Sequence, residues 1–346
     1  MDVGFVRYEK FSQQSIVTRT LFSVASHYGV DFFYANAKEI DISRKVINAT
    51  VWDKESKTYV QKEIGYPKVL DVSSALSYTD PAIHDELFKT VVFSNGPRFG
   101  GKSKIYDVIK DCGYEKYLIE TCNYSEANIE ELLGKYKTLI IKPNHGALAK
   151  NIYKLTTAGD MYELRIDNEV MKLTKDEFQN DYDAKFRRGY IVQRYVDSVT
   201  NSGNPFTIRA LILRGKDGEF TTRKVSARIG SIGYVAANFS VGSVAYYNVI
   251  LPMEFGDGWR SIYYEILNMS LRLSEGIQKS YPRLIDGFGF DIGIDRSNNN
   301  ELKIFEVNPY PGVIPFGFEC ADAKINYYMY LMDNHEEILK NQLLNP

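Results

Sequence analysis

The 346-residue sequence has few of the residues that build zinc sites and disulfide frameworks, with three cysteines and four histidines. Cys112, Cys122 and Cys320 are odd in number and lack CxxC spacing, which argues against both kinds of framework. So few cysteines suit a reducing compartment, and we expect a cytoplasmic protein. The sequence also lacks a stretch approaching the ~20 apolar residues of a membrane-spanning helix. Its charged start, MDVGFVRYEK, is unlike a signal peptide.

The sequence has no excess of charge of either sign. Lysine plus arginine number 42 and aspartate plus glutamate 44, which gives a formal net charge of −2. This balance argues against a general nucleic-acid-binding protein and against a peripheral membrane protein. An anionic ligand must therefore be held by a local cluster of cations. At 346 residues the chain exceeds the usual size of one hydrophobic core, so we expect two or three packed lobes.

The pattern of apolar residues predicts an α+β fold that begins with a βαβ unit. The pattern favours strands at Val3–Tyr8 and Asp31–Ala35, with a helix between them at Ser12–Tyr28. Such a start implies a parallel sheet with a right-handed crossover. The run SNGP at 94–97 breaks the pattern and places the first boundary near residue 95. The predicted domains are an N-terminal α/β lobe over 1–95, a central α+β lobe over 96–192 and a C-terminal α+β lobe over 193–346.

The rest of the chain is predicted to be mostly antiparallel. Ser125 is expected to cap a helix that runs to Tyr136, and a strand meander is expected from Phe206 onward, including Tyr234–Asn238. One C-terminal helix is expected around 320–343. The other expected elements are helices Lys102–Cys112 and Gly256–Tyr281, and strands Lys68–Val72, Tyr117–Thr121, Thr138–Lys142, 151–156, 161–166, 170–173, Tyr190–Val196, Phe220–Ile229, Gly289–Asp295 and Lys303–Val307.

The segment Gly287–Gly312 is the most informative about chemistry. Asp291 lies on one predicted strand and Glu306 and Asn308 lie on the next. Because Glu306 and Asn308 are two residues apart, they point to the same face of their strand. Two carboxylates and an amide oxygen suit Mg²⁺, which needs only one or two carboxylates in addition to nucleotide phosphates. For Glu306 and Asn308 alone, a solvent-facing acidic strand end before a loop is the alternative.

Four basic residues could complete a site for an anion. Lys142 leaves an apolar strand into the loop PNHG, and Lys102 begins a helix after two glycines, and both places favour phosphate. Arg209 and Arg228 lie inside alternating strands. Each of them taken alone is more often an exposed residue. Beside the acidic set, the four together indicate a phosphate-binding site.

The motifs in this order resemble those of the ATP-grasp superfamily. The order is Lys102, IIKPNHG, YIVQRYVDS, TIRALILRG, SARIG with NFSVG, FDIG and FEVNPYPG. Within the superfamily, FSNGPRFGGKSKIYDVIKDCG and YLIETCNYSEANIEELLGKYKTLIIKPNHGALAKNI resemble the YheC/YheD branch of spore-coat-associated proteins. The resemblance covers residues 93–315. It implies an ATP-grasp fold, in which an N-terminal α/β lobe precedes two α+β subdomains that sandwich ATP.

The resemblance implies a role for each matching residue. The residues implied at the nucleotide phosphates are Lys102, Lys142, His145 and Gly146, and those along the adenine and ribose are Gln193, Arg194, Tyr195, Val196 and Asp197. The catalytic residues implied to neutralise the γ-phosphate are Arg209 and Arg228. The implied ligands of one or two Mg²⁺, with Mn²⁺ as an alternative, are Asp291, Glu306 and Asn308. The residues implied on the substrate side are Asn238, Gly242, Pro311 and Gly312.

The resemblance also implies an activity, that of an ATP-dependent carboxylate–amine ligase working through an acyl phosphate and releasing ADP and phosphate. The amine would belong to an amino acid, a peptide or an amino sugar, and the protein would be a monomer or homodimer without nucleic-acid or membrane partners. A kinase-type phosphoryl transferase and a non-catalytic nucleotide-binding scaffold are the alternatives. The acidic set and the two arginines argue against a scaffold, whereas the phosphate loop, which has Gly146 as its only glycine, argues for one.

Overall fold

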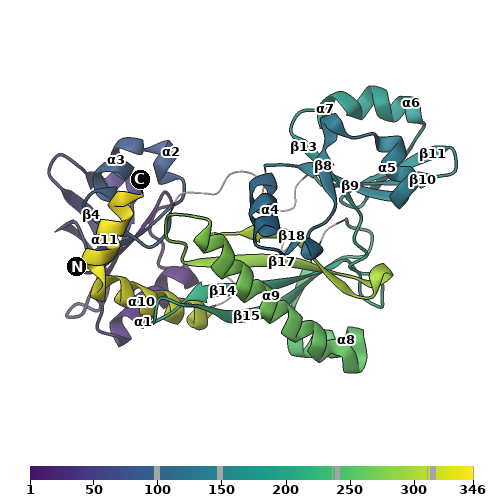
Figure 1. Ribbon diagram of the computed structural model, residues 1–346. Helices are drawn as coiled ribbons and strands as arrows, with labels where there is room; N and C mark the ends of the chain where they lie inside the picture. Colours follow the sequence, from purple (N-terminus) through teal and green to yellow (C-terminus); the bar gives the residue numbers. More distant parts are fainter. Residues whose placement is uncertain are drawn as a thin grey trace.

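The computed structural model describes residues 1–96, 102–145, 151–235, 237, 242–309, 311 and 317–345. These residues form three lobes, each built on its own sheet. In Figure 1 the N-terminal lobe lies at the left, the central lobe in the middle and the small lobe at the upper right. The combination of three sheets with packed helices confirms the predicted α+β class. In the described part of the chain, no helix is both long and apolar enough to cross a membrane.

The N-terminal lobe has a seven-stranded sheet with the order β3-β4-β2-β1-β6-β7, and β5 pairs with β4. Strands β1, β2, β6 and β7 run parallel, which confirms the predicted βαβ start. Parallel pairing brings their carboxyl ends to one edge of the sheet. The elements are β1 (Val3–Arg7), α1 (Ile16–His27), β2 (Phe32–Asn36), β3 (Ile40–Asp41), β4 (Val46–Asp53), β5 (Thr58–Gly65), β6 (Val69–Val72), α2 (Leu76–Thr79), α3 (Pro81–Phe88) and β7 (Val92–Phe93).

The small lobe has a six-stranded sheet with the order β12-β11-β10-β9-β13-β8. One face of this sheet packs against α5, α6 and α7 around the fully buried Phe186. The opposite face carries polar side chains from β9, β10 and β13. The elements are β8 (Thr121–Asn123), α5 (Ile129–Tyr136), β9 (Thr138–Pro143), β10 (Tyr153–Ala158), β11 (Met161–Ile166), β12 (Glu169–Leu173), α6 (Lys175–Phe178), α7 (Ala184–Phe186) and β13 (Tyr190–Arg194).

The central lobe has a fully antiparallel five-stranded sheet with the order β16-β15-β14-β17-β18. Helices α4 and α9 cover one face and bury Ile109, Ile266 and Leu273 against it. The long predicted helix is confirmed as α9. The elements are α4 (Lys102–Asp111), β14 (Phe206–Arg214), β15 (Phe220–Gly230), β16 (Gly242–Tyr246), α8 (Tyr247–Phe255), α9 (Trp259–Lys279), β17 (Gly287–Asp295) and β18 (Glu301–Asn308).

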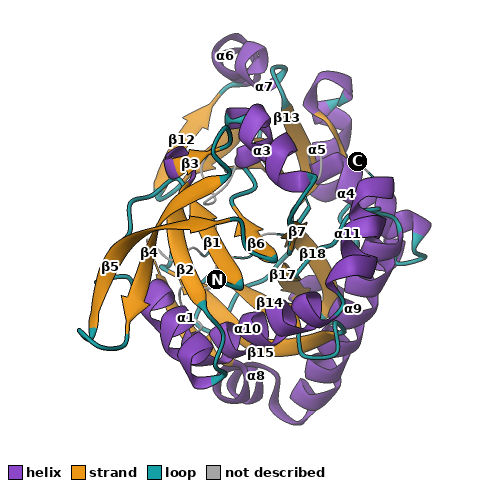
Figure 2. Ribbon diagram, turned by 90° about the vertical axis from the view of Figure 1, so that its left-hand side faces the viewer, coloured by secondary structure: helices purple, strands orange, loops and turns teal. Residues whose placement is uncertain are grey.

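Helices α10 (Gly317–Asp333) and α11 (His335–Leu344) return the chain to the N-terminal lobe. Figure 2 shows α10 beside α1 under the N-terminal sheet. Tyr327, Tyr328 and Leu331 of α10 are buried in the same core as residues of α1, β1 and β2. Helix α4 similarly leaves the segment of the small lobe and packs in the core of the central lobe. We therefore propose that the predicted boundaries at 95/96 and 192/193 divide the sequence, whereas each packed lobe contains segments that are not consecutive in the chain.

A buried cluster of charges fixes α10 at the carboxyl edge of the N-terminal sheet. Lys324 Nζ lies 2.8 Å from Asp71 Oδ2 and 2.5 Å from Asp286 Oδ2. Asp71 also accepts hydrogen bonds from Arg7 Nη2, at 2.7 Å, and from Tyr328 Oη. Asp71 lies on β6 and Asp286 precedes β17, so the cluster joins the N-terminal lobe, the central sheet and the C-terminal helix.

Four predicted elements differ from the structure. Helix α5 starts at Ile129 because the side chain of Asn128, not that of Ser125, caps it by accepting from the Glu131 N–H at 3.2 Å. The strand expected over 117–121 begins only at its last residue, as β8. The preceding backbone turns instead, with the Tyr117 N–H donating to the Tyr114 carbonyl at 3.0 Å.

The other two differences lie nearer the end of the chain. The prediction of a strand over 234–238 is wrong for the residues described there, which are 234, 235 and 237 and belong to no strand. The strand that pairs with β15 is β16. The single C-terminal helix is divided at Asn334, where the backbone leaves the helical region with φ −108° and ψ 23°.

Candidate functional site

The candidate site lies on the face of the central sheet opposite α4 and α9. Odd-numbered residues of β17 point to this face, and they are all glycine or aspartate, whereas the even-numbered ones are in the core. A β-bulge at Phe305 places Glu306 directly opposite Asp291 on β17. The bulge turns Glu306 and Asn308 to the face of Asp291 while Ile304 and Val307 stay in the core.

The carboxylate of Asp291 lies between two arginines from neighbouring strands. Arg209 Nε donates to Oδ1 at 2.7 Å and Arg209 Nη2 donates to Oδ2 at 2.6 Å, a bidentate pair. Arg228 Nη1 donates to Oδ1 at 3.3 Å. Burial acts to lower the pKa of Arg209, but Asp291 outweighs it and the pKa is raised, whereas burial lowers that of Arg228. Both guanidinium groups are thus held, partly desolvated, on one carboxylate.

Gly289 provides the space in which the guanidinium of Arg209 lies. Gly289 is opposite Asn308 in the sheet. A Cβ at this position would come within 2.7 Å of Arg209 Nη1 and 3.1 Å of the Cβ of Pro311. Arg209 therefore lies across β17 at a point without a side chain, with Pro311 beside it. Glycine is required here by a close approach, not by its backbone angles.

The polar face of the small lobe contacts the central sheet through Lys142. This buried lysine on β9 donates from Nζ to the carbonyl of Phe305 at 3.3 Å. In the adjacent strand β13, Gln193 Nε2 donates to Tyr106 Oη at 2.9 Å and to Thr121 Oγ1 at 2.7 Å. Burial raises the pKa of Tyr106 to about 12, and the charge of Glu306 adds to the effect. Glu306 thus faces a neutral phenol.

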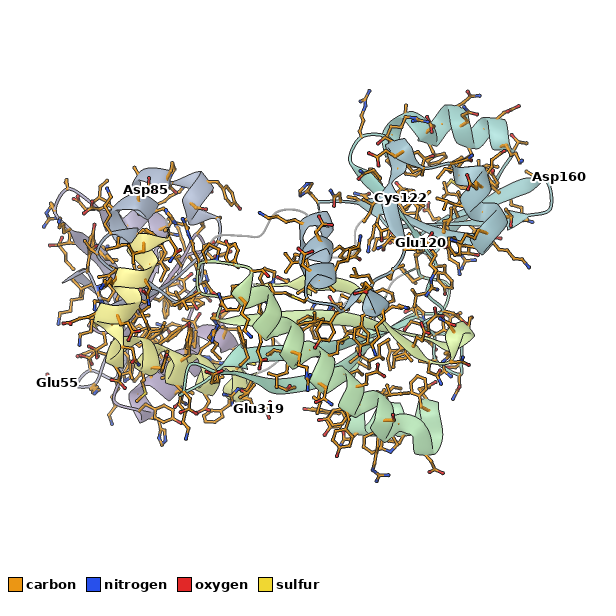
Figure 3. All side chains as sticks on the ribbon, viewed as in Figure 1. Glu55, Asp85, Glu120, Cys122, Asp160 and Glu319 are labelled. Carbon is orange, nitrogen blue, oxygen red and sulfur yellow. The ribbon has the colours of Figure 1, made fainter. Side chains whose placement is uncertain are left out.

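The segment Gln193–Asp197, called here the hinge, joins the small lobe to the central lobe. Arg194 Nη1 donates to Asp295 Oδ2 at 2.7 Å, and the Asp197 N–H donates to Asp295 Oδ1 at 3.3 Å. Lys154 Nζ lies 3.9 Å from the centre of the Tyr195 ring. Burial raises the pKa of Tyr195 to about 12 and lowers that of Lys154. Figure 3 labels Glu120 at the base of the small lobe, where its carbonyl accepts from the Arg194 N–H at 3.3 Å.

The structure brings most of the predicted site residues to one region and leaves others apart. Those on the facing polar surfaces of the small lobe and central sheet are Lys142, Gln193, Arg209, Arg228, Asp291, Glu306, Asn308 and Pro311. Arg194, Tyr195, Val196 and Asp197 form the hinge between them. His145 is exposed beyond β9, and Gly242 lies on the edge strand β16, opposite Gly230. Gly146, Asn238 and Gly312 lie outside the described residues, and Lys102 is described only as the first residue of α4.

Four residues at the site were not predicted from sequence. Gly289 and Asp295 were detectable in principle, since GFGFDIGID places glycine or aspartate at every second position of one strand. Lys154 follows the phosphate loop by four residues, in an alternating segment without a distinguishing pattern. No sequence pattern marks Tyr106 as a site residue, because only the tertiary structure brings it to Gln193 and within the electrostatic influence of Glu306.

The donor set fits a hard divalent cation that takes its remaining ligands from a phosphate. Within the described residues, no group of three or more His, Cys, Asp and Glu side chains is arranged to hold a metal. Asp291, Glu306 and Asn308 offer two carboxylates and an amide oxygen on one face. Mg²⁺ is typically bound by one or two carboxylates together with substrate phosphates and water. This set is therefore sufficient for Mg²⁺ only when a phosphate is also present.

Comparison with solved structures shows that the fold is shared with two synthetases. The structure is similar to D-cycloserine synthetase DcsG, with a TM-score of 0.55 and 10% identity over 97% of this chain and 100% of that one. It is also similar to N5-carboxyaminoimidazole ribonucleotide synthetase in an ADP complex, with a TM-score of 0.52 and 11% identity over 90% of this chain and 70% of that one.

The chain belongs to the YheC/D-like ATP-grasp family, whose model matches residues 90–332. A curated relative is the endospore coat-associated protein YheD of Bacillus subtilis (strain 168), which is 25% identical over 193 residues. That match covers 53% of this chain and 42% of YheD, so the chain spans less than half the length of the relative. The resemblance seen in the sequence motifs, at the level of both superfamily and branch, is confirmed.

Proposed function

We propose that the protein is an ATP- and Mg²⁺-dependent ligase that joins a carboxylate to an amine through an acyl phosphate. The observation that carries the proposal is the pair Arg209 and Arg228, held on Asp291 beside Glu306 and opposite Lys142. Fixed cations next to metal-type oxygen donors are the groups that phosphoryl transfer needs. Membership of the ATP-grasp family supports the nucleotide assignment.

The proposed reaction has two steps. A carboxylate oxygen attacks the γ-phosphorus of ATP, so that an O–P bond forms and the bond to the β,γ-bridging oxygen breaks, releasing ADP. The amine then attacks the acyl carbon, a C–N bond forms, the C–O bond to phosphate breaks, and the amine loses a proton. A carboxylate at neutral pH is a poor electrophile, and phosphorylation gives it a leaving group. No protein nucleophile is required.

Each residue of this chain would act by binding and charge neutralisation. Lys142, Arg209 and Arg228 would hold phosphate oxygens and stabilise the charge that spreads over the transferred group. Glu306, Asn308 and Asp291, which pairs with Glu306 in the sheet, would hold Mg²⁺, and the metal would supply positive charge against the phosphates. The backbone of the hinge would lie along the adenine.

The remaining site residues complete the proposal. The residues proposed to contact the nucleotide phosphates are Lys102, His145 and Gly146, and those on the substrate side are Asn238, Gly242, Pro311 and Gly312. An amino acid, peptide or amino sugar would supply the amine, in the cytoplasm, with the protein a monomer or homodimer. The synthetase names of the two similar solved structures support a ligase over a kinase.

Thermal unfolding tests the nucleotide–metal site without knowledge of the substrate. A ligand at ~100 times its dissociation constant stabilises the native state by ~2.7 kcal/mol, which raises the midpoint by a few degrees. We expect this rise with Mg²⁺ and a non-hydrolysable ATP analogue, and its loss in Glu306→Gln. Glu301→Gln is the matched control, because Glu301 lies on the same strand with a side chain 50% exposed and paired to Lys303. It should respond as the wild type does.

The ligase reaction itself is tested by ADP release from pools of acids and amines, with hydroxylamine added to trap an acyl phosphate. A hydroxamate that forms only with ATP and one acid supports the two-step reaction. A phosphorylated product that accumulates unchanged in the presence of amines supports the kinase instead. The absence of any thermal shift in the wild type at millimolar nucleotide contradicts the proposal and favours the non-catalytic scaffold.

A further inference from the structure

We propose that the outer edge of β16 is a docking site for an extended, acidic segment of a polypeptide, which adds to the central sheet as a further strand. The inference rests on the proposed function and deepens it, because it makes a polypeptide one of the two substrates. Main-chain hydrogen bonds hold such a segment, and basic side chains next to the strand select its charge. The reacting group lies outside the docked residues, further along the same polypeptide.

Strand β16 lacks the protection that the other described edge strands have. Natural sheets protect an exposed edge by short strands, charged side chains or proline. Strands β3, β7 and β8 have only two or three residues, and β5, β12 and β18 each carry lysine and glutamate. Strand β16 has five residues, GSVAY, with neither charge nor proline. No strand in the described part of the chain pairs with its outer edge, which is therefore open to a further strand.

The register of the sheet shows which backbone groups of β16 face the open edge. The Gly230 N–H donates to the Pro205 carbonyl at 2.8 Å, on the side of β14. Gly242 lies opposite Gly230, so its own N–H and carbonyl point the other way, to the outer edge. This direction recurs at every second residue of an antiparallel strand, so the N–H and carbonyl of Val244 and the N–H of Tyr246 point outward as well. An extended segment would find a row of donors and acceptors there.

The open edge lies next to the proposed site of phosphoryl transfer. Val244 is opposite Arg228, which contacts Asp291. Neighbouring strands lie about 4.8 Å apart, so a segment added to β16 would lie roughly 10 Å from the backbone of β15. An extended chain covers about 3.3 Å per residue, so roughly three residues connect the docked segment to the position of Arg228. Docking at β16 would thus bring a nearby residue of the polypeptide to the phosphate.

Charge favours an acidic polypeptide over a second copy of this chain. Lys224 lies on the same face of β15 as Arg228, because Val225 and Ala227 point into the core. Lys224 Nζ is 5.0 Å from the centre of the ring of Tyr246, which is the last residue of β16 and is 62% exposed. Carboxylates of a docked segment would be attracted to this lysine. Two copies paired through β16 would instead bring two such lysines to one continuous face, where like charges repel.

Fluorescence anisotropy tests the docking site, with a labelled decapeptide of alternating glutamate and valine as the probe. We expect the wild-type protein to bind it with a dissociation constant of about 1 mM or tighter, and about tenfold more tightly than a lysine–valine counterpart. Val244→Pro should weaken this binding about tenfold, because proline removes an outward N–H and leaves the hydrogen bonds to β15 intact. Val244→Ile is the matched control and should bind as the wild type does. Lys224→Glu should abolish the preference for the glutamate peptide.

A change in the peptide tests the main-chain hydrogen bonds without a protein variant. The glutamate peptide N-methylated at alternate amides keeps its charge but loses those donors, and it should bind the wild type about tenfold more weakly. Equal binding of the two glutamate peptides would overturn the inference, as would no binding of either. A wild-type dimer in sedimentation equilibrium that Val244→Pro dissociates would overturn it in favour of a second copy.

Thermal unfolding with Mg²⁺ and the ATP analogue separates this inference from the proposed function. Val244→Pro should keep the wild-type rise in midpoint, which shows that the variant is folded. Wild-type protein that shows the rise but does not bind the glutamate peptide refutes the docking site alone. Peptide binding without the rise refutes the proposed function and leaves β16 as a docking surface only.

Discussion

Replacing Lys324 by methionine removes the cation that joins α10 to the N-terminal lobe and to the start of β17. Asp71 and Asp286, the two carboxylates that contact its ammonium, are only 1% and 4% exposed. Asp71 keeps Arg7 as an ion-pair partner, whereas Asp286 has no other ion pair with a described residue. Methionine retains the length and the apolar stem of lysine, so the substitution removes charge with little change in packing.

The expected loss of stability follows from leaving a buried carboxylate without its cation. Breaking a buried ion pair by removing one partner costs about 3–5 kcal/mol. Here one ammonium serves two carboxylates, which then repel each other, so we expect the upper part of that range. At about 2–4 °C per kcal/mol for a cooperative unit of ~150–250 residues, a loss of about 4–5 kcal/mol should lower the unfolding midpoint by about 8–20 °C.

The loss should depend on pH in a definite direction. Burial raises the pKa of Asp286 above its ordinary value even with Lys324 present, and replacing Lys324 removes a charge that lowers this pKa while Asp71 continues to raise it. A carboxyl with a raised folded pKa destabilises the fold fully at high pH, and the penalty shrinks as pH falls through the folded pKa and the group binds a proton. The deficit of Lys324→Met relative to wild type should therefore be smaller near about pH 5 than near about pH 8.

Urea unfolding of four proteins checks this reasoning. The matched control is Lys303→Met. Lys303 is also buried and donates to the Lys116 carbonyl at 2.6 Å, but its ion-pair partner Glu301 is half-exposed. Removing Lys303 therefore leaves no buried carboxylate without a cation. We expect it to lose less stability than Lys324→Met. Adding Asp286→Asn to Lys324→Met should restore part of the loss. A Lys324→Met protein within about 1 kcal/mol of wild type at neutral pH would refute the argument, as would a double variant less stable than the single one.

Two further predictions concern the close approach in the site and the thiols. Gly289→Ala should weaken binding of an ATP analogue about tenfold by pushing Arg209 out of its position, and unchanged affinity in calorimetry would show that Arg209 adapts. Burial raises the pKa of Cys320 to about 12, so native protein treated with iodoacetamide should be alkylated at Cys112 and Cys122 well before Cys320. Mass spectrometry showing Cys320 among the first modified would mean that α10 leaves the lobe readily.

Sequence predicts the structure best where one strand or helix carries its own periodic signal. Glu306 and Asn308 were expected on one face from their spacing alone, and the register of β17 and β18 confirms it. The helix signal of α9 and the alternation of β14 were similarly unambiguous. The start of α5 was predicted wrongly because two nearby residues, Ser125 and Asn128, are both favourable N-caps. The hydrogen bond from the Glu131 N–H shows that Asn128 is the cap.

The contacts between elements were beyond such reasoning. Nothing in the motif FTIRALIL says that Arg209 pairs with Asp291, 82 residues later, because the register between β14 and β17 is a tertiary property. The bulge at Phe305, whose carbonyl accepts a hydrogen bond from Lys142, has no pattern of its own in the sequence. The site was therefore foreseen as a set of residue types in the right order, and its internal pairing was not.

The return of α10 to the first lobe has a consequence for how the chain is made. Apolar residues of α1 such as Leu21 share a core with Ile325 and Leu331, about 300 residues further along the chain. At a synthesis rate of about 5–20 residues per second, the start of the chain waits roughly 15–60 s for the helix that covers it. During that interval the nascent N-terminal sheet exposes an apolar face, so a ribosome-associated chaperone should engage it until residues 317–333 emerge.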